Sequence, residues 1–317
     1  MQRNAAILIG LAVVVLAAII AFLLLSRPPA AEPSPPASAS ASASAEASTE
    51  PSIEPSATLN ADLLERRWTV LFVGIDANAS READPEFVPN ADAIMLVSLS
   101  EDQSELTLVS LPRDTVDVPL PDGGVWDRKI NALWSEGGPD ALVGAMETLF
   151  DVPIDGYLAL DMDDFTALVD AVGGVQVSPD APLVDPKVDL NLQPGPQEID
   201  AETANGYVRT RVDQDYGRMA RQQEVLLALA SELADPETQV DLAQLVEDLE
   251  SLQTDLPLDE FPTLVELMRR ATDAEVQTLV IQPPLIVFEG DRGDGRGYVL
   301  EPDVEAIRAE VRELIGE

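Results

Sequence analysis

Arginines are concentrated in one short part of a chain that is otherwise strongly acidic. Four of them fall within 13 residues of the stretch YVRTRVDQDYGRMARQQ: Arg209, Arg211, Arg218 and Arg221. If Tyr207 to Arg211 is extended, the first two arginines project to one face. The other two are expected in the first turn of a helix, where free N–H groups and the helix dipole already favour an anion. The pattern predicts a phosphate-binding site, because guanidinium groups match phosphate oxygens.

The same arginines have a plainer interpretation. Asp213, Asp215 and the neighbouring acids could pair with them as ordinary surface ion pairs, which contribute little to stability. Gln222 lies beside the cluster, and Lys129, in RKINALW, is a further candidate because the chain has only one other lysine. The residues alone leave both interpretations open.

A second group of polar residues flanks three expected buried strands. Residues 68–73, 94–99 and 106–111 are apolar, β-rich runs, and a polar turn joins the last two into a hairpin. The hairpin places Asp92, Arg113 and Asp114 at one sheet edge, and Asp76 joins them if the first strand pairs antiparallel to its neighbour. Each aspartate alone is explained by turn chemistry. Together, carboxylates beside phosphate oxygens predict a site for Mg²⁺ or Mn²⁺, because hard cations take oxygen ligands.

Composition narrows the chemistry that this site could perform. The 317 residues include no His and no Cys, which removes the Ser-His-Asp triad, most zinc sites and disulfides. A net charge of −39 argues against nucleic acid binding, which needs a basic surface. Any catalysis must therefore come from carboxylates, hydroxyls, Arg, Lys or a bound hard cation.

The N-terminal part is expected to lie outside the globular domain. Residues 5–25 are uncharged and almost wholly apolar; as a helix they would span about 31 Å, longer than the core of a cleaved signal peptide needs. We expect a short cytoplasmic N-terminus at 1–4, a single-pass transmembrane helix at 5–25, a disordered Pro/Ala/Ser-rich linker at 26–60 and one domain at 61–317. Basic residues flank both ends of the apolar run, so the length of the remaining acidic chain is what places the domain outside the cytoplasm at the cell membrane.

The domain itself predicts an α/β fold with a central mixed β-sheet covered by helices. Further strands are expected at 157–160, 175–177, 276–281 and 298–300, with a strand or its approach at 204–211 and a long loop at 180–200. Amphipathic helices are expected at 139–150, 162–172, 219–233, 242–252, 261–271 and 303–315. Their apolar stripes are most simply core.

Several motifs, in order and at similar spacing, resemble the LytR-CpsA-Psr family. They are LPRDT, KINALWSEGGPDALVGAMETLFDVPIDGYLALD, LVDAVGGVQV, QPGPQEIDAETANGYVRTR and DYGRMARQQ. The resemblance implies an α/β/α sandwich with a hydrophobic tunnel for a polyprenyl tail. It also implies a Mg²⁺-dependent phosphotransferase that moves a glycopolymer from a polyprenyl pyrophosphate carrier onto peptidoglycan during cell-wall assembly.

The resemblance also assigns roles by matching position. Asp76 and Asp92 would be the metal-side carboxylates. Catalysis would rest on Arg113, Asp114, Arg211, Asp215 and Arg218. The pyrophosphate would be bound by Arg113, Lys129, Arg209, Arg211, Arg218, Arg221 and Gln222.

Two positions depart from the family pattern, because Asn78 and Asn90 stand where the family often has arginine. Arg81 or Lys129 could compensate for the missing charge. The departures keep two alternatives open beside the transferase: a non-catalytic module that binds or senses polyprenyl pyrophosphate precursors, and a polyprenyl pyrophosphate hydrolase. The glycopolymer, the acceptor hydroxyl, the general base, the prenyl length and the oligomeric state are not specified by the sequence.

Overall fold

The computed structural model describes most of the expected domain. It covers residues 59–316, apart from 85–86, 235–237, 239, 241–244, 246–247, 250, 258–259 and 272–273. The expected transmembrane segment, nearly all of the linker and most of the helix expected at 242–252 lie outside these residues. No helix within the described ranges is both long and apolar enough to cross a membrane.

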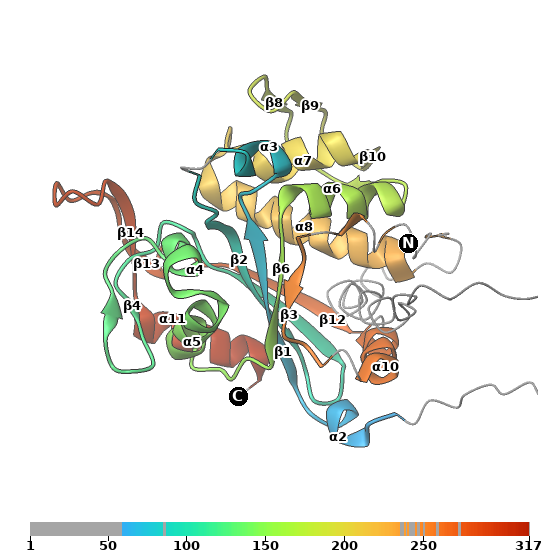
Figure 1. The fold of residues 1–317 in the computed structure, drawn as a ribbon, viewed down its shortest axis with the longest axis horizontal. Helices are drawn as coiled ribbons and strands as arrows, with labels where there is room; N and C mark the ends of the chain where they lie inside the picture. The colour runs from blue at the N-terminus through green and yellow to red at the C-terminus, as the bar shows by residue number, and fades with distance from the viewer. Residues whose placement is uncertain are drawn as a thin grey trace, which may run out of the picture.

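A six-stranded mixed sheet forms the centre of the domain (Figure 1). Its strands lie in the order β11-β6-β1-β2-β3-β12, with parallel pairing of β6 to β1 and of β3 to β12 and antiparallel pairing elsewhere. The expected hairpin is confirmed, and the first strand pairs antiparallel to its neighbour. The bounds are β1 Trp68–Ile75, β2 Ala91–Leu99, β3 Glu105–Ser110, β6 Gly156–Leu160, β11 Gln253–Thr254 and β12 Glu275–Val280.

Both faces of this sheet are buried, because its central strands are apolar on both sides. Phe72 belongs to the core on one face, and its neighbours Leu71 and Val73 belong to the core on the other. The first face is covered by α6 Met162–Ala171, α7 Ala201–Arg209, α8 Gln214–Ala234 and α10 Phe261–Ala271. The second is covered by α4 Asn131–Gly137, α5 Pro139–Phe150 and α11 Val304–Ile315. Two further helices are short: α2 Ala61–Leu64 and α3 Ala79–Glu82.

Aspartates begin three of these helices. The Asp161 side chain accepts hydrogen bonds from the first backbone N–H groups of α6, Asp200 does the same for α7, and Asp303 for α11. A carboxylate at this position satisfies N–H groups that have no partner inside the helix and complements the helix dipole.

Three expectations about the segment 180–218 are wrong. Residues 204–211 are not a strand: α7 occupies Ala201–Arg209, because Asp200 caps a helix whose buried face then continues to Tyr207. The expected loop at 180–200 contains three short strands, β8 Leu183–Asp185, β9 Leu190–Leu192 and β10 Gln197–Ile199. The next helix starts at Gln214 rather than Met219, so Arg218 and Arg221 lie beyond its first turn.

A hairpin near the C-terminus adds a wall that the sequence did not predict in full. Its strands are β13 Ile286–Asp291 and β14 Tyr298–Pro302, and only the second was expected. The backbone N–H of Leu300 donates to the carbonyl of Asp114 at 3.1 Å, and Val116 donates back to Leu300 at 2.9 Å. The hairpin is thereby fixed to the segment that follows β3. That segment continues into two further short strands, β4 Val118–Pro119 and β5 Val125–Trp126.

Asp164 on α6 makes the fold sensitive to pH. Its side chain is buried, and burial, reinforced by Asp161, raises its pKa to about 7 from the ordinary 3.8. The folded protein therefore keeps this carboxyl neutral where the unfolded chain ionises it, so the free energy of unfolding decreases as pH rises from about 4 to about 7. We expect Asp164→Asn to raise the melting temperature by several degrees at about pH 8 and by much less at about pH 4.

Calorimetry of Asp164→Asn at the two pH values measures this effect. Asp170→Asn, at an exposed position of the same helix, is the matched control. Equal changes in melting temperature at both pH values would contradict the assignment.

Candidate functional site

Strand ends bring the first group of candidate residues to one edge of the sheet. Ile75 at the end of β1 pairs with Ala91 at the start of β2, and the backbone N–H of Asp76 donates to the Asn90 carbonyl at 3.0 Å. Asp76, which follows β1, and Asp92, the second residue of β2, therefore lie at neighbouring strand ends. Arg113 follows β3 at the same edge, where it pairs with Asp92.

A cavity of about 340 Å³ opens at this edge. Seven charged candidates contribute to its wall: Asp76, Arg81, Asp92, Arg113, Arg209, Arg211 and Arg218. The rest of the lining is mainly apolar and comes from β1, α6, α7 and α8, including Phe72, Phe165, Leu168, Val208, Leu226, Leu229 and Leu233. Arg218 and Leu233 lie about 22 Å apart along the axis of α8, at about 1.5 Å per residue. The cavity thus passes from a charged end to an apolar end along this helix.

Arg218 is the most enclosed cation of the charged end. Only 3% of its side chain is exposed, and its Nε and Nη2 donate to the two carboxylate oxygens of Asp215 at 2.9 and 3.1 Å. Its Nη1 donates to the backbone carbonyl of Asp92 at 3.0 Å. This bidentate pair fixes the guanidinium and ties α8 to the start of β2.

Arg113 has hydrogen-bonding capacity to spare. Its Nη1 pairs with Asp92, but its Nε is buried and has no hydrogen-bond partner in the structure. Burial alone would lower the pKa of Arg113, yet the nearby carboxylates of Asp92 and Asp114 outweigh burial and raise it. A bound anion would give this permanently charged group the acceptor that it lacks.

The cations of this end repel one another. The pKa of Arg211 is lowered by burial and then by the charges of Arg113 and Arg218. Asp215 lies among the same three arginines; burial would raise its pKa, but the arginines, led by its hydrogen-bonded partner Arg218, lower it. Asp92 also acts on Arg113 and Arg211, so carboxylates offset part of this repulsion, and an added anion would relieve more of it.

Arg81 brings an additional cation to the cavity wall. Asn78 caps α3 by accepting from the backbone N–H of Arg81 at 2.9 Å, and the Arg81 side chain pairs with Asp76. Its guanidinium lies 5.9 Å from the centre of the Phe87 ring. Asn78 therefore begins a short helix that places an arginine beside the site, three residues later than the family pattern would.

The remaining candidates separate into two groups. Arg209 and Gln222 line the cavity, and Gln222 donates to the Val208 carbonyl at 3.2 Å. Lys129 is not among the cavity-lining residues; it pairs with Asp114 at 2.8 Å. Arg221 also lies outside the lining, and its contact with pyrophosphate stays a prediction.

Arg221 holds the turn between α7 and α8 together. It is 5% exposed, and it donates to the carbonyls of Tyr207 and Thr210 at 2.9 and 2.6 Å and to Asp213 at 2.5 Å. We expect Arg221→Met to lower the free energy of unfolding by about 3 kcal/mol, because buried carbonyls lose their donor. Urea unfolding measures this loss. An unchanged midpoint would mean that Arg221 acts elsewhere.

Two polar residues of the cavity lining were not predicted. Asp161 and Asn205 both contribute to the cavity wall. Their sequence signals point elsewhere, because an aspartate before an apolar helix indicates a cap, and an asparagine within a helix has no distinctive spacing. Phe165, Leu168, Leu226, Leu229 and Leu233 were expected as core. A stripe that lines an apolar cavity has the same helical period as one that packs against a sheet.

The donor set at the edge fits a hard cation only together with a ligand. No group of three or more metal-binding side chains occurs in the part of the chain that the structure describes. Asp76 and Asp92 supply carboxylate oxygens, each paired here with an arginine. Mg²⁺ commonly takes one or two carboxylates and completes its shell with water and substrate phosphates. The residues present meet that requirement if a phosphate is bound.

A charged end of fixed arginines that continues into an apolar cavity defines a site for an amphiphile with an anionic head and a hydrocarbon tail. The LytR_cpsA_psr family model matches residues 36–311. The chain belongs to this family.

Individual relatives agree with that assignment. The polyisoprenyl-teichoic acid–peptidoglycan teichoic acid transferase TagV of Bacillus subtilis (strain 168) is 27% identical over 266 residues, which are 80% of this chain and 66% of that protein. The probable cell wall biosynthesis protein LcpB of Corynebacterium glutamicum is 39% identical over 153 residues, 48% of this chain and 36% of that protein. The match therefore covers less than two thirds of the length of either relative.

A solved structure extends the likeness to the fold. The crystal structure of B. subtilis TagV has a TM-score of 0.64 and 26% identity to this chain, and the match covers 80% of this chain and 98% of that one. The α/β fold with a central mixed sheet is thus shared with a structure of the same family.

Proposed function

We propose that this protein transfers a glycopolymer from a polyprenyl pyrophosphate carrier to peptidoglycan. The observation that carries the proposal is the continuity of the arginine-lined end with the apolar cavity along α8. The head of such a carrier is a multiply charged anion and its tail is a long hydrocarbon. The name of the TagV relative, a transferase from a polyisoprenyl carrier to peptidoglycan, supports the same reaction class.

In the proposed reaction an acceptor hydroxyl oxygen forms a bond to the phosphorus that bears the glycopolymer. The bond from that phosphorus to the bridging oxygen breaks, and polyprenyl phosphate leaves with the electron pair. Charge develops on the non-bridging and leaving oxygens, where preorganised guanidinium groups are most effective. Arg113, Arg211 and Arg218, which lie close enough together to act on Asp215, would supply these groups. The hydroxyl proton would pass to a carboxylate of the edge, Asp92 or Asp114, or to solvent.

A divalent cation is part of the proposal. Asp76 and Asp92 would hold Mg²⁺, or Mn²⁺, against the pyrophosphate, and the ion would neutralise phosphate charge. Because each aspartate is paired with an arginine here, a bound ion would compete with those pairs.

The location of the chain follows from the proposed donor. Residues 5–25 would anchor the protein in the cell membrane as a single pass, with 26–60 as a linker and the domain at 61–317 outside the cytoplasm. A tail that is embedded in the membrane could then enter the cavity without leaving the membrane surface.

A transfer assay tests the proposed function. The whole chain in lipid nanodiscs, supplied with Mg²⁺, a polyprenyl pyrophosphate-linked glycan and uncross-linked peptidoglycan, is expected to release polyprenyl phosphate and attach the glycan to the acceptor. Release without attachment would identify a hydrolase. Donor binding without release of polyprenyl phosphate would identify a binding module, and either result would overturn the transferase proposal.

A further inference from the structure

Three side chains outside the cavity form a hydrogen-bonded group at the rim of the site. Glu289 on β13 accepts from the hydroxyl of Tyr216 on α8 at 3.1 Å and from the hydroxyl of Tyr298 on β14. Burial, aided by Glu289, raises the pKa of Tyr298 to about 12 and also raises that of Tyr216. Both hydroxyls therefore remain protonated donors at neutral pH. We call this group the tyrosine rim.

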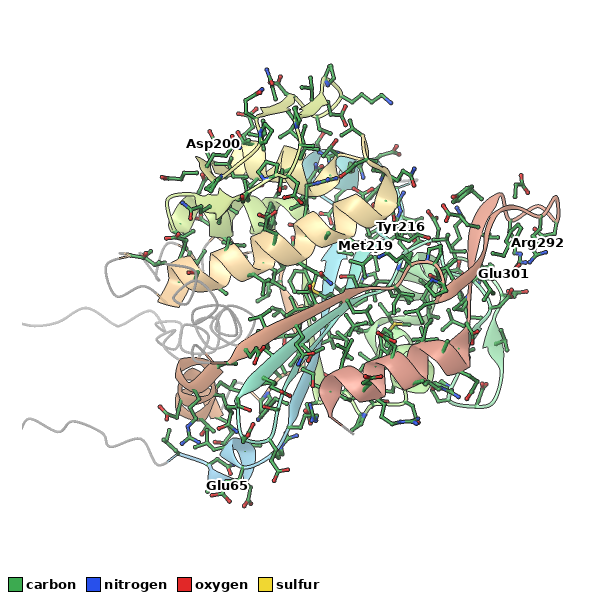
Figure 2. The ribbon with its side chains drawn as sticks, turned by 180° about the vertical axis from the view of Figure 1, so that it is seen from behind. Glu65, Asp200, Tyr216, Met219, Arg292 and Glu301 are labelled. Atoms are coloured by element: carbon green, nitrogen blue, oxygen red, sulfur yellow. The ribbon has the colours of Figure 1, made fainter. Side chains whose placement is uncertain are left out.

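The tyrosine rim borders the arginine site. Glu289 pairs across the hairpin with Leu300, which lies two residues from Tyr298, so Glu289 and Tyr298 lie on the same face as Leu300. The backbone of Leu300 is hydrogen-bonded to that of Asp114, and the charges of Asp114 and Asp215 act on Tyr298. Figure 2 shows Tyr216 at the end of α8 beside the hairpin that carries Arg292 and Glu301.

The hairpin is held firmly enough to serve as a binding wall. Arg296 near its tip pairs with both carboxylate oxygens of Asp117 at 3.0 and 3.1 Å and donates to the Asp127 carbonyl at 3.1 Å. These contacts fix the tip to the segment that contains β4 and β5, while Leu300 fixes its base. Tyr298, a residue that is 50% exposed, is thus presented on a rigid support.

The rim lies outside the cavity. Tyr216, Glu289 and Tyr298 are not among the lining residues, which come mainly from β1, α6, α7 and α8. An in-line displacement at phosphorus requires the attacking and leaving oxygens to lie on opposite sides. With the leaving polyprenyl phosphate directed into the cavity, the attacking hydroxyl has to enter from outside it, where the rim is placed.

We propose that the tyrosine rim is the acceptor subsite, and that it binds a sugar ring of the peptidoglycan glycan strand. This inference rests on the proposed function. An exposed tyrosine ring offers an apolar face with a polar edge, and the Glu289 carboxylate has acceptor sites beyond those used by the two tyrosines. Its negative charge would repel the donor's phosphates, so the rim suits an uncharged, hydroxyl-bearing ring.

The residues of the rim have distinct tasks in this arrangement. Tyr298 stacks on the sugar and Glu289 accepts from its hydroxyls, whereas Tyr216 positions Glu289. The bond between the acceptor oxygen and phosphorus forms as the bond to polyprenyl phosphate breaks, and the rim takes no part in the proton transfer.

Acceptor kinetics of Tyr298→Ala test the assignment, with the whole chain in nanodiscs and soluble, uncross-linked glycan-strand fragments as the probe. We expect the acceptor KM to rise about tenfold, the size of a contact that dominates a small binding surface, with kcat and donor affinity unchanged. Phe288→Ala removes an aromatic ring from the opposite face of the same hairpin and is expected to leave the acceptor KM unchanged. Tyr298→Phe should retain most of the affinity.

Direct titration of the same glycan fragments separates this inference from the proposed function. Fragment binding that Tyr298→Ala weakens and Phe288→Ala does not would support the subsite even if no transfer were detected. Failure of the unmodified chain to bind the fragments, or an acceptor KM for Tyr298→Ala within about twofold of the unmodified chain, would overturn it.

Discussion

Replacing Arg113 with alanine is expected to lower the transfer rate by about 10²- to 10³-fold, the usual cost of removing one preorganised donor from a developing oxyanion. Arg113 lines the cavity and carries a buried Nε without a hydrogen-bond partner in the structure. The substitution would therefore remove a hydrogen bond that Arg113 forms only when the ligand is bound. Arg113→Lys should recover only part of the rate, because an ammonium lacks the planar fork of a guanidinium.

Single-turnover release of polyprenyl phosphate measures this effect without interference from product release. Arg128→Ala is the matched control, because Arg128 is half-exposed, pairs with Glu136 and does not line the cavity. Thermal melting of both variants would show whether each is folded. A folded Arg113→Ala variant that keeps more than about a tenth of the rate would contradict a role in stabilising the transferred group.

Filling the apolar part of the cavity is expected to weaken binding of the donor while leaving its head group recognised. Val208 is a half-buried residue of α7 that lines the cavity, so Val208→Trp would place a bulky ring where the tail has to lie. We expect the affinity for a polyprenyl pyrophosphate to fall by at least about tenfold, because buried methylene groups contribute about 0.8 kcal/mol each. Inorganic pyrophosphate should bind as before.

Calorimetric titration with the two ligands separates tail from head. Val212→Trp adds the same ring at a position that is 51% exposed and outside the cavity lining, and it should bind both ligands normally. If Val208→Trp weakened binding of both ligands equally, the change would reflect general damage to the site. If the affinity for neither ligand changed, the tail would bind outside this cavity.

The edge of the sheet is the part of the site that the sequence predicts best. A short turn joins β2 to β3, so the hairpin places Asp92 and Arg113 at one edge, and Asp76 joins them because β1 pairs antiparallel to β2. The arginine cluster stands out for a different reason, since positive charge is rare in this chain.

The segment that carries the cluster is predicted poorly. The residues YVRTR have the alternation typical of a strand, but the capping carboxylate of Asp200 starts a helix that continues to Arg209. Spacing alone also fails to separate Arg218, which lines the cavity, from Arg221, which holds the turn below it. That difference depends on which carbonyls lie within reach after α7 and α8 have packed, and local pattern does not contain it.

The cavity itself is a tertiary property. Leu226, Leu229 and Leu233 repeat at helical spacing, as core residues do, and only the gap between α8 and the sheet shows that they border open space. The β13–β14 hairpin is similar, because its importance comes from its contact with Asp114, far away in the sequence.

One binding comparison tests the central claim, that the charged end and the apolar cavity form one site for a lipid pyrophosphate. The whole chain in nanodiscs would be titrated with a short-chain prenyl pyrophosphate, the corresponding prenyl alcohol and inorganic pyrophosphate. We predict that the prenyl pyrophosphate binds at least about tenfold more tightly than either part, and that each part competes with it. Equal affinity for the alcohol and the pyrophosphate ester, or a failure of inorganic pyrophosphate to compete, would contradict the claim.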